Sequence, residues 1–229
     1  MAGRIREPVV AGQFYPGDAR QLEAMVREFL ARGEPGAGRT LLAMAPHAGY
    51  VFSGAVAGRT LGSARLPRRI LLLGPNHTGM GARLAVWPDG AWRFPGGQLD
   101  VDDALAEALM AEDGRFTPDT AAHAQEHSLE VMLPFLSALD PQTAIVPVAV
   151  AERDPGVLLE LGAAVARVIA AAGEPVAMVV SSDMSHYVSH ERAAEMDRQA
   201  LDAALTLNPR ALYATVADKG ISMCGVLPM

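Results

Sequence analysis

The chain has 229 residues and a single cysteine; half of its residues are apolar, but only 5% are aromatic. This length suits one large domain or two small ones, and it allows an aliphatic core that needs no disulfide. A formal net charge of −7 argues against a nucleic-acid groove, which requires a basic surface. No apolar run is long enough to cross a bilayer and the first residues lack a signal-peptide pattern, so we expect a cytoplasmic protein without a membrane segment.

Helical and strand-like patterns alternate along the chain. Short apolar runs between turn residues predict strands that are buried on both faces, at Thr40–Ala45, Ile70–Leu73, Thr143–Val150 and Val176–Val180. Apolar spacings of three and four predict helices at Asp18–Arg32, Val101–Ala111, Ser128–Leu139, Asp154–Ala172 and Glu191–Leu205, with a last helix from Asn208 that Gly220 closes. The Gly-rich stretch Arg32–Arg39 reads as a loop. The alternation predicts an α/β protein, a three-layer α/β/α sandwich with a mostly parallel central sheet.

Three of the predicted strands run directly into segments that contain a histidine. These histidines are His47, His77 and His186, and Asp183 precedes the last of them. In an open parallel sheet, ligands bind beyond the carboxyl ends of the strands, so we expect these side chains to converge. A single histidine after a strand is more often structural, but three in the same topological position indicate a site. Because imidazole is the commonest neutral metal ligand, the sequence predicts a metal or catalytic site there.

Two further segments carry candidate functional residues. Cys224 is either a small buried hydrophobic residue or a thiolate ligand, and the residues around it leave both readings open. Glu126 and Glu130 are one helical turn apart, so in a helical segment they would share a face. His127 lies between them and is a candidate for orienting a catalytic group or for a supporting hydrogen bond to a ligand.

The segment His123–His127 (HAQEH) also matches H-x-x-E-H, a zinc-peptidase pattern in which two histidines bind zinc and the glutamate activates water. That pattern requires a helix around the motif. Here Ser128 resembles an N-cap, which would begin the helix after the motif, and the chain offers no obvious third ligand. We therefore favour the strand-end site over a zinc peptidase.

Five ordered motifs, PHAGYVFSG, LGPNHTG, EHSLEVMLPF, VVSSDMSH and SMCG, together with the opening VAGQFYP, resemble the Memo family. Bacterial and archaeal members are often named AmmeMemoRadiSam system protein B. The resemblance covers essentially the whole chain and implies a single Memo-like domain over residues 1–229, with a fold akin to the catalytic subunit of class III extradiol dioxygenases. Members usually continue with a further helix and strand, so the resemblance implies that these elements are missing after Met229.

The resemblance also assigns roles to individual residues. It implies that His47, His77 and Cys224 hold one metal ion, with Cys224 in the position of the carboxylate ligand of the dioxygenases. Fe(II) is the expected metal, and copper or zinc are alternatives because a thiolate is a soft ligand. His186 resembles the acid–base histidine of the dioxygenases, and Asp183 lies beside it in the sequence. Beyond the resemblance, we expect Asp183, His127 and Glu130 to orient His186, and we expect Tyr50, Phe52 and Phe14 to form pocket walls.

The expected function is a metal-dependent oxidoreductase that acts with radical-SAM system proteins. Classical ring cleavage does not follow, because the thiolate donates more charge than a carboxylate does. The alternative is a non-catalytic module that uses the same pocket to bind a small molecule, a peptide or a partner protein.

Overall fold

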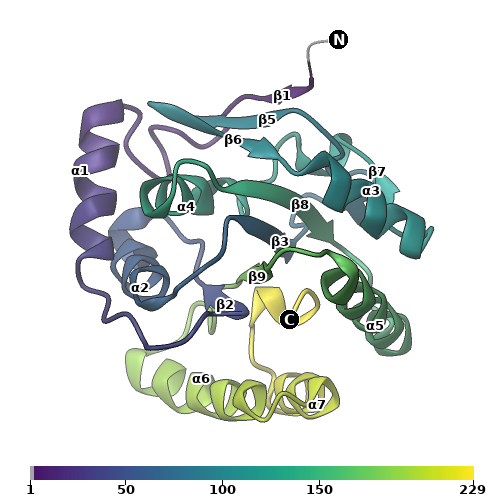
Figure 1. Cartoon of the computed structure of the whole chain (residues 1–229). Helices are drawn as coiled ribbons and strands as arrows, with labels where there is room; N and C mark the ends of the chain where they lie inside the picture. The colour runs from purple at the N-terminus through teal and green to yellow at the C-terminus, as the bar shows by residue number, and fades with distance from the viewer. Residues whose placement is uncertain (1–2) are drawn as a thin grey trace.

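The computed structural model describes residues 3–229 and contains one mixed, mostly parallel sheet with the strand order β1-β5-β6-β8-β3-β9-β2 (Figure 1). The strands are β1 (Ile5–Arg6), β2 (Leu42–Ala45), β3 (Arg69–Pro75), β4 (Leu84–Val86), β5 (Ala91–Phe94), β6 (Gly97–Val101), β7 (Thr117–Pro118), β8 (Ala144–Val150) and β9 (Val176–Ser181). The antiparallel pairs are β5 with β6 and β4 with β8. All four strands predicted from apolar runs are present.

Helices cover both faces of this sheet. They are α1 (Ala19–Leu30), α2 (Tyr50–Ser63), α3 (Asp103–Glu112), α4 (Leu133–Leu139), α5 (Pro155–Ala171), α6 (His190–Leu205) and α7 (Pro209–Lys219), with the short 3₁₀ helices η1 (Ala121–His123), η2 (Glu130–Met132) and η3 (Cys224–Val226). Side chains of α1, α2 and α4 form one core cluster with the sheet, and side chains of α3 and α5 form a second. The predicted three-layer sandwich is confirmed.

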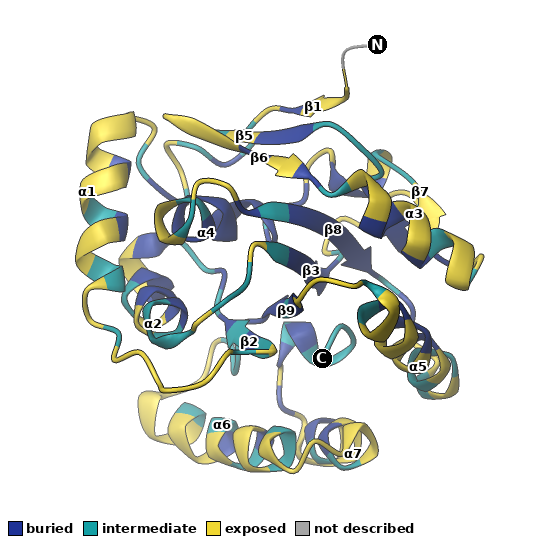
Figure 2. Cartoon of the chain, in the orientation of Figure 1, coloured by how far each residue is buried: buried dark blue, intermediate teal, exposed yellow. Residues whose placement is uncertain are grey.

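The central strand β3 shows why the apolar runs lack alternation. Ile70 and Leu72 belong to the core cluster on the α1, α2 and α4 side, whereas Leu71 and Leu73 belong to the cluster under α3 and α5. Successive side chains of a strand point to opposite faces, so a strand covered on both sides is apolar throughout. Figure 2 shows β3 and β8 as buried segments between the helices.

Helix α2 was not predicted, because glycines interrupt its apolar pattern. Gly58 is packed so closely against α1 that an added Cβ would lie 2.3 Å from the Cβ of Phe29, and one on Gly62 would lie 2.3 Å from the carbonyl oxygen of Leu30. Glycine is unfavourable inside a helix by about 1 kcal/mol relative to alanine. The close contact between the two helices therefore explains residues that local propensity alone disfavours.

The predicted helix Ser128–Leu139 begins later than expected. The backbone N–H of Ser128 donates to the side chain of Glu126, a single 3₁₀ turn follows, and regular helix starts only at Leu133 with Pro134 in its first turn. The segment before α4 is consequently irregular, and this irregular backbone carries much of the candidate site. Within residues 3–229, no helix is both long and apolar enough to cross a membrane.

Candidate metal centre

The candidate site lies at the carboxyl ends of three adjacent parallel strands, β3, β9 and β2. His77, Asp183 and His47 each lie two residues beyond the end of one of these strands. Cys224 reaches them from η3, where its backbone N–H donates to the carbonyl of Asp183 at 3.3 Å. The structure thus brings together side chains that are up to 177 residues apart in the sequence.

Donor atoms of His47, His77 and Cys224 all lie within 4.8 Å of one another. The sulfur of Cys224 is 3.3 Å from Nε2 of His47. Histidine nitrogens at about 2.1 Å and a thiolate at about 2.3 Å from one metal ion would be separated by roughly 3.1 to 3.7 Å. The pair Cys224 and His47 already has this separation, and the three side chains together are a group that can hold a metal ion.

The orientation of His47 is fixed by a chain of hydrogen bonds. The Ser181 hydroxyl donates to the carbonyl of Ser128 at 2.5 Å, which leaves its oxygen to accept from Nδ1 of His47 at 2.7 Å. The imidazole proton consequently sits on Nδ1, and the lone pair of Nε2 faces the sulfur of Cys224. Hydrogen bonding of the far nitrogen in this way is characteristic of metal-ligating histidines.

Glu126 orients His77 in the same manner. Its fully buried carboxylate accepts hydrogen bonds from the backbone N–H of His77 at 2.5 Å and from Nδ1 of His77 at 2.9 Å. It also accepts from the backbone N–H groups of His127 and Ser128 at 3.0 and 2.9 Å. Three of these four donors meet Oε1 and one meets Oε2, so the carboxylate holds the backbone and ring of His77 in place. Glu126 also forms, with His77 and His127, a second group of side chains whose donor atoms lie within 4.8 Å of one another.

The histidine pKa values differ in direction because their surroundings differ. Burial lowers the pKa of His47 to about 4, so this imidazole is neutral at pH 7. A hydrogen bond with Cys224 and one with Glu126 raise the pKa of His77 to about 10. Hydrogen bonds from His77 and the neighbouring amides outweigh burial and lower the pKa of Glu126 to about 2. In the metal-free chain, His77 therefore holds a proton that a metal ion has to displace.

Asp183 connects the strand ends to η3. Its Oδ1 accepts from the backbone N–H groups of His47 and Ala48 at 2.7 and 3.1 Å, and its own N–H donates to the sulfur of Cys224 at 3.2 Å. Its second oxygen, Oδ2, is 3.9 Å from Nε2 of His47 and 4.0 Å from Nε2 of His186. The carboxylate thus lies between the donor set and the candidate proton-transfer group.

His186 is partly exposed and presents one nitrogen to the site. Its Nδ1 is 2.8 Å from the carbonyl oxygen of Ser222, which can only accept, so the proton lies on Nδ1. Its backbone N–H donates to the hydroxyl of the same serine at 2.7 Å. In the neutral tautomer that this contact favours, the lone pair is on Nε2, which is the atom that can act as a base.

His127 lies beside the donor set, and its ring stacks on that of His77 with centroids 4.9 Å apart. Phe14 packs against the outer side of His127 at 4.7 Å. The other two residues predicted to form pocket walls, Tyr50 and Phe52, do not pack against these rings. Tyr50 is buried in the core, where its hydroxyl donates to the carbonyl of Val131, and Phe52 is 83% exposed.

The structure places Glu130 in a buried cluster away from the donor set. Its carboxylate forms an ion pair with Arg6 at 2.7 Å and accepts from the hydroxyl of Tyr15 at 2.6 Å. The backbone N–H groups of Val9 and Val10 also donate to it. With these partners, Glu130 anchors the N-terminal segment and makes no hydrogen bond to the proposed catalytic groups.

The two histidines of the HAQEH motif do not face a common site. His123 is fully buried, its Nε2 contacts the carbonyl oxygen of Ala85 at 3.0 Å, and its ring packs edge-on against Trp92. His127 instead lies with His77, as described above. The motif carries only a short 3₁₀ turn, η1, in place of the helix that the zinc-peptidase pattern requires.

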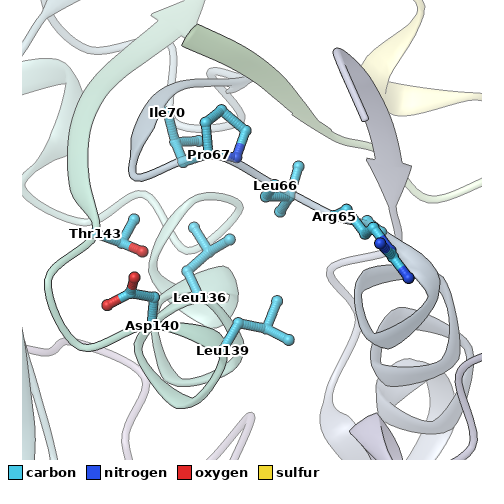
Figure 3. A pocket seen from close by; sticks show the side chains of 9 residues that line it. Arg65, Leu66, Pro67, Ile70, Leu136, Leu139, Asp140 and Thr143 are labelled. Atoms are coloured by element: carbon cyan, nitrogen blue, oxygen red, sulfur yellow. The ribbon is translucent and has the colours of Figure 1, made fainter. Parts of the chain in front are cut away.

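A small cavity of about 130 Å³ lies at the other end of the sheet, near the start of β3 and β8 (Figure 3). Its walls include the aliphatic side chains of Ile70 and Leu136, and the carboxylate of Asp140 beside it is paired with Arg68. The side chains that line this cavity include no group of histidine, cysteine and carboxylate ligands for a metal. The functional assignment therefore rests on the donor set at the carboxyl ends of the strands.

The sequence patterns missed Ser181 and the role of Glu126. Ser181 is the first polar residue after the predicted strand Val176–Val180. Its position at a strand end is the same local signal that indicated the histidines. The role of Glu126 had no local signal, since its partner His77 is 49 residues away.

The fold and the donor set define an α/β protein with a histidine–cysteine group of the kind that can hold a metal ion, at the carboxyl edge of its sheet. The chain belongs to the Memo family, since the model for "Memo-like protein" matches residues 6–229. A MEMO1 family protein of Methanopyrus kandleri is 39% identical over 97% of this chain and 83% of its own length. Those of Aquifex aeolicus and Sulfurisphaera tokodaii are 37% and 34% identical, each over 98% of this chain and over 84% and 85% of their own lengths.

Proposed function

We propose that the chain is a metal-dependent oxidoreductase, related to the extradiol dioxygenases, whose single metal ion is held by His47, His77 and Cys224. The observation that carries this proposal is the group of three donors within 4.8 Å, in which Ser181 and Glu126 engage the other nitrogen of each imidazole. Two histidines and one carboxylate with open positions are typical of non-haem Fe(II) oxygenases, and Cys224 stands here in place of the carboxylate. Fe(II) is the metal we expect, ahead of copper or zinc. A bound redox-active metal would supply electron transfer to oxygen.

The chain itself supplies the proton chemistry. The contact of Nδ1 with the carbonyl of Ser222 favours the tautomer of His186 with its lone pair on Nε2, and this atom can accept the proton of a substrate hydroxyl. The resulting imidazolium lies 4.0 Å from Oδ2 of Asp183, which stabilises the positive charge. Positioned general bases of this kind typically contribute about 10²- to 10⁴-fold to a rate.

Side chains at the edge of the donor set offer contacts for an apolar or aromatic substrate. Phe14 and His127 form a packed pair next to His77. The resemblance to AmmeMemoRadiSam system proteins supports a second part of the proposal, that the chain works in the cytoplasm beside a radical-SAM enzyme.

The test is anaerobic purification followed by metal analysis and by oxygen uptake against a panel of catechols. We expect His186→Gln to retain the metal and to lower oxygen uptake about 100-fold. His190→Gln, which changes an exposed histidine at the start of α6, should leave both unchanged. Stoichiometric metal that survives both His47→Ala and His77→Ala would contradict the proposal. Metal binding without turnover of any catechol would favour the non-catalytic binding module.

A further inference from the structure

Arg6 is a buried cation close to the candidate metal centre. Its side chain is 3% exposed and donates three hydrogen bonds to one stretch of the chain. Nε donates to the carbonyl of His123 at 2.9 Å, and one terminal nitrogen donates to the carbonyl of Glu126 at 2.6 Å. The other terminal nitrogen pairs with the carboxylate of Glu130 at 2.7 Å. All three acceptors belong to residues 123–130, called the ligand-support segment below.

The ligand-support segment has little regular structure of its own. It begins at the last residue of η1 and ends at the first residue of η2, and no helix or strand lies between these short turns. Buried carbonyl groups outside helices and sheets need other partners, and the guanidinium of Arg6 supplies two. Because this group is planar and rigid, its three bonds fix the relative positions of the acceptors. The ring of Trp92, 4.2 Å from the guanidinium carbon, covers its face.

The same segment carries the carboxylate that orients His77. Arg6 holds the backbone carbonyl of Glu126, while the side chain of Glu126 accepts from Nδ1 and from the backbone N–H of His77. We infer that Arg6 is a positioning residue for the metal centre, acting through Glu126 on the ring of His77. This inference rests on the proposed function, because His77 is a metal ligand only there.

The first test measures the affinity of the purified full chain for Co²⁺ alone, by competition with a chelator. In Arg6→Lys the charge remains, but one ammonium group cannot hold three acceptors in a fixed plane, so we expect Co²⁺ binding to weaken about tenfold or more. The matched control is Tyr15→Phe, which removes a buried hydrogen bond to Glu130 and leaves the bonds to both carbonyls intact. It should bind Co²⁺ like the parent chain. Equal affinity in Arg6→Lys and the parent, or equal weakening in both variants, would overturn the inference.

The second test uses the metal-free chain and so does not depend on the proposed function. In ¹⁵N-histidine NMR spectra, the Nδ1–H of His77 should give a slowly exchanging signal that is absent in His77→Gln. We expect faster exchange in Arg6→Lys and unchanged exchange in Tyr15→Phe. An unchanged signal in folded Arg6→Lys would refute the role of Arg6, even if the parent chain binds metal. Failure of the parent chain to bind Co²⁺, with the NMR result as expected, would refute the proposed metal centre and leave the coupling of Arg6 to His77 supported.

Discussion

The carboxylate of Glu126 offers the sharpest test of how the donor set is held. Its Oε1 accepts three hydrogen bonds and its Oε2 accepts the backbone N–H of His77 at 2.5 Å. In Glu126→Gln, the amide oxygen can replace Oε1, but the amide NH₂ then points at that N–H. One hydrogen bond to a charged group is lost, which costs about 1.5 to 3 kcal/mol of stability. The group that orients His77 also loses its charge.

We expect Glu126→Gln to bind metal about 10- to 100-fold more weakly than the parent chain, which is about 1.4 to 2.7 kcal/mol. The assay is competition for Zn²⁺ with a chromophoric chelator, combined with urea unfolding to measure stability. Glu152→Gln serves as the control, because this carboxylate accepts backbone N–H groups from Arg153 and Asp154 and touches none of the donors. Parent-like affinity in folded Glu126→Gln would refute the reasoning, as would an equal loss in the control.

Three further predictions follow from the same contacts. Burial lowers the pKa of His123 from 6.5 to about 4. Between pH 6.5 and pH 4 the unfolded chain therefore binds more protons at this residue than the folded chain does, and acidification lowers the free energy of unfolding. The contribution of His123 amounts to about 2 kcal/mol between pH 7 and pH 5. His123→Gln keeps a donor for the carbonyl of Ala85 and should flatten that part of the urea-unfolding profile; an unchanged slope would contradict the assignment. Ser181→Ala removes the acceptor for Nδ1 of His47 and should weaken Zn²⁺ binding about tenfold in the chelator assay. Because the pKa of His77 is raised to about 10, metal binding at pH 7 should release a proton and tighten as the pH rises, which calorimetry in two buffers of different ionisation enthalpy will detect.

The sheet and the strand-end histidines were predictable because their signals are local. A strand covered on both faces is apolar throughout, and parallel strands bring their carboxyl ends to one edge. Helix α2 was not predictable in this way. Gly58 and Gly62 lower its intrinsic helix propensity, and only the contact with α1, from a different part of the chain, explains them.

The two glutamates show the same limit within the candidate site. Their spacing of one helical turn would place Glu126 and Glu130 on one face of a helical segment, which suggests a shared role. The irregular backbone before α4 separates them, so that Glu126 contacts His77 and Glu130 contacts Arg6. These partners are 49 and 124 residues away, and no pattern within the segment distinguishes the two carboxylates.

The central claim is that His47, His77 and Cys224 together bind one metal ion. Titration of the metal-free chain with Co²⁺ under anaerobic conditions tests it most directly, because a thiolate ligand produces an intense near-ultraviolet charge-transfer band. We predict saturation at one Co²⁺ per chain with this band present, loss of the band in Cys224→Ser, and parent-like behaviour in His123→Gln. No saturable binding in the parent chain, or binding whose spectrum is unchanged in Cys224→Ser, would contradict the account.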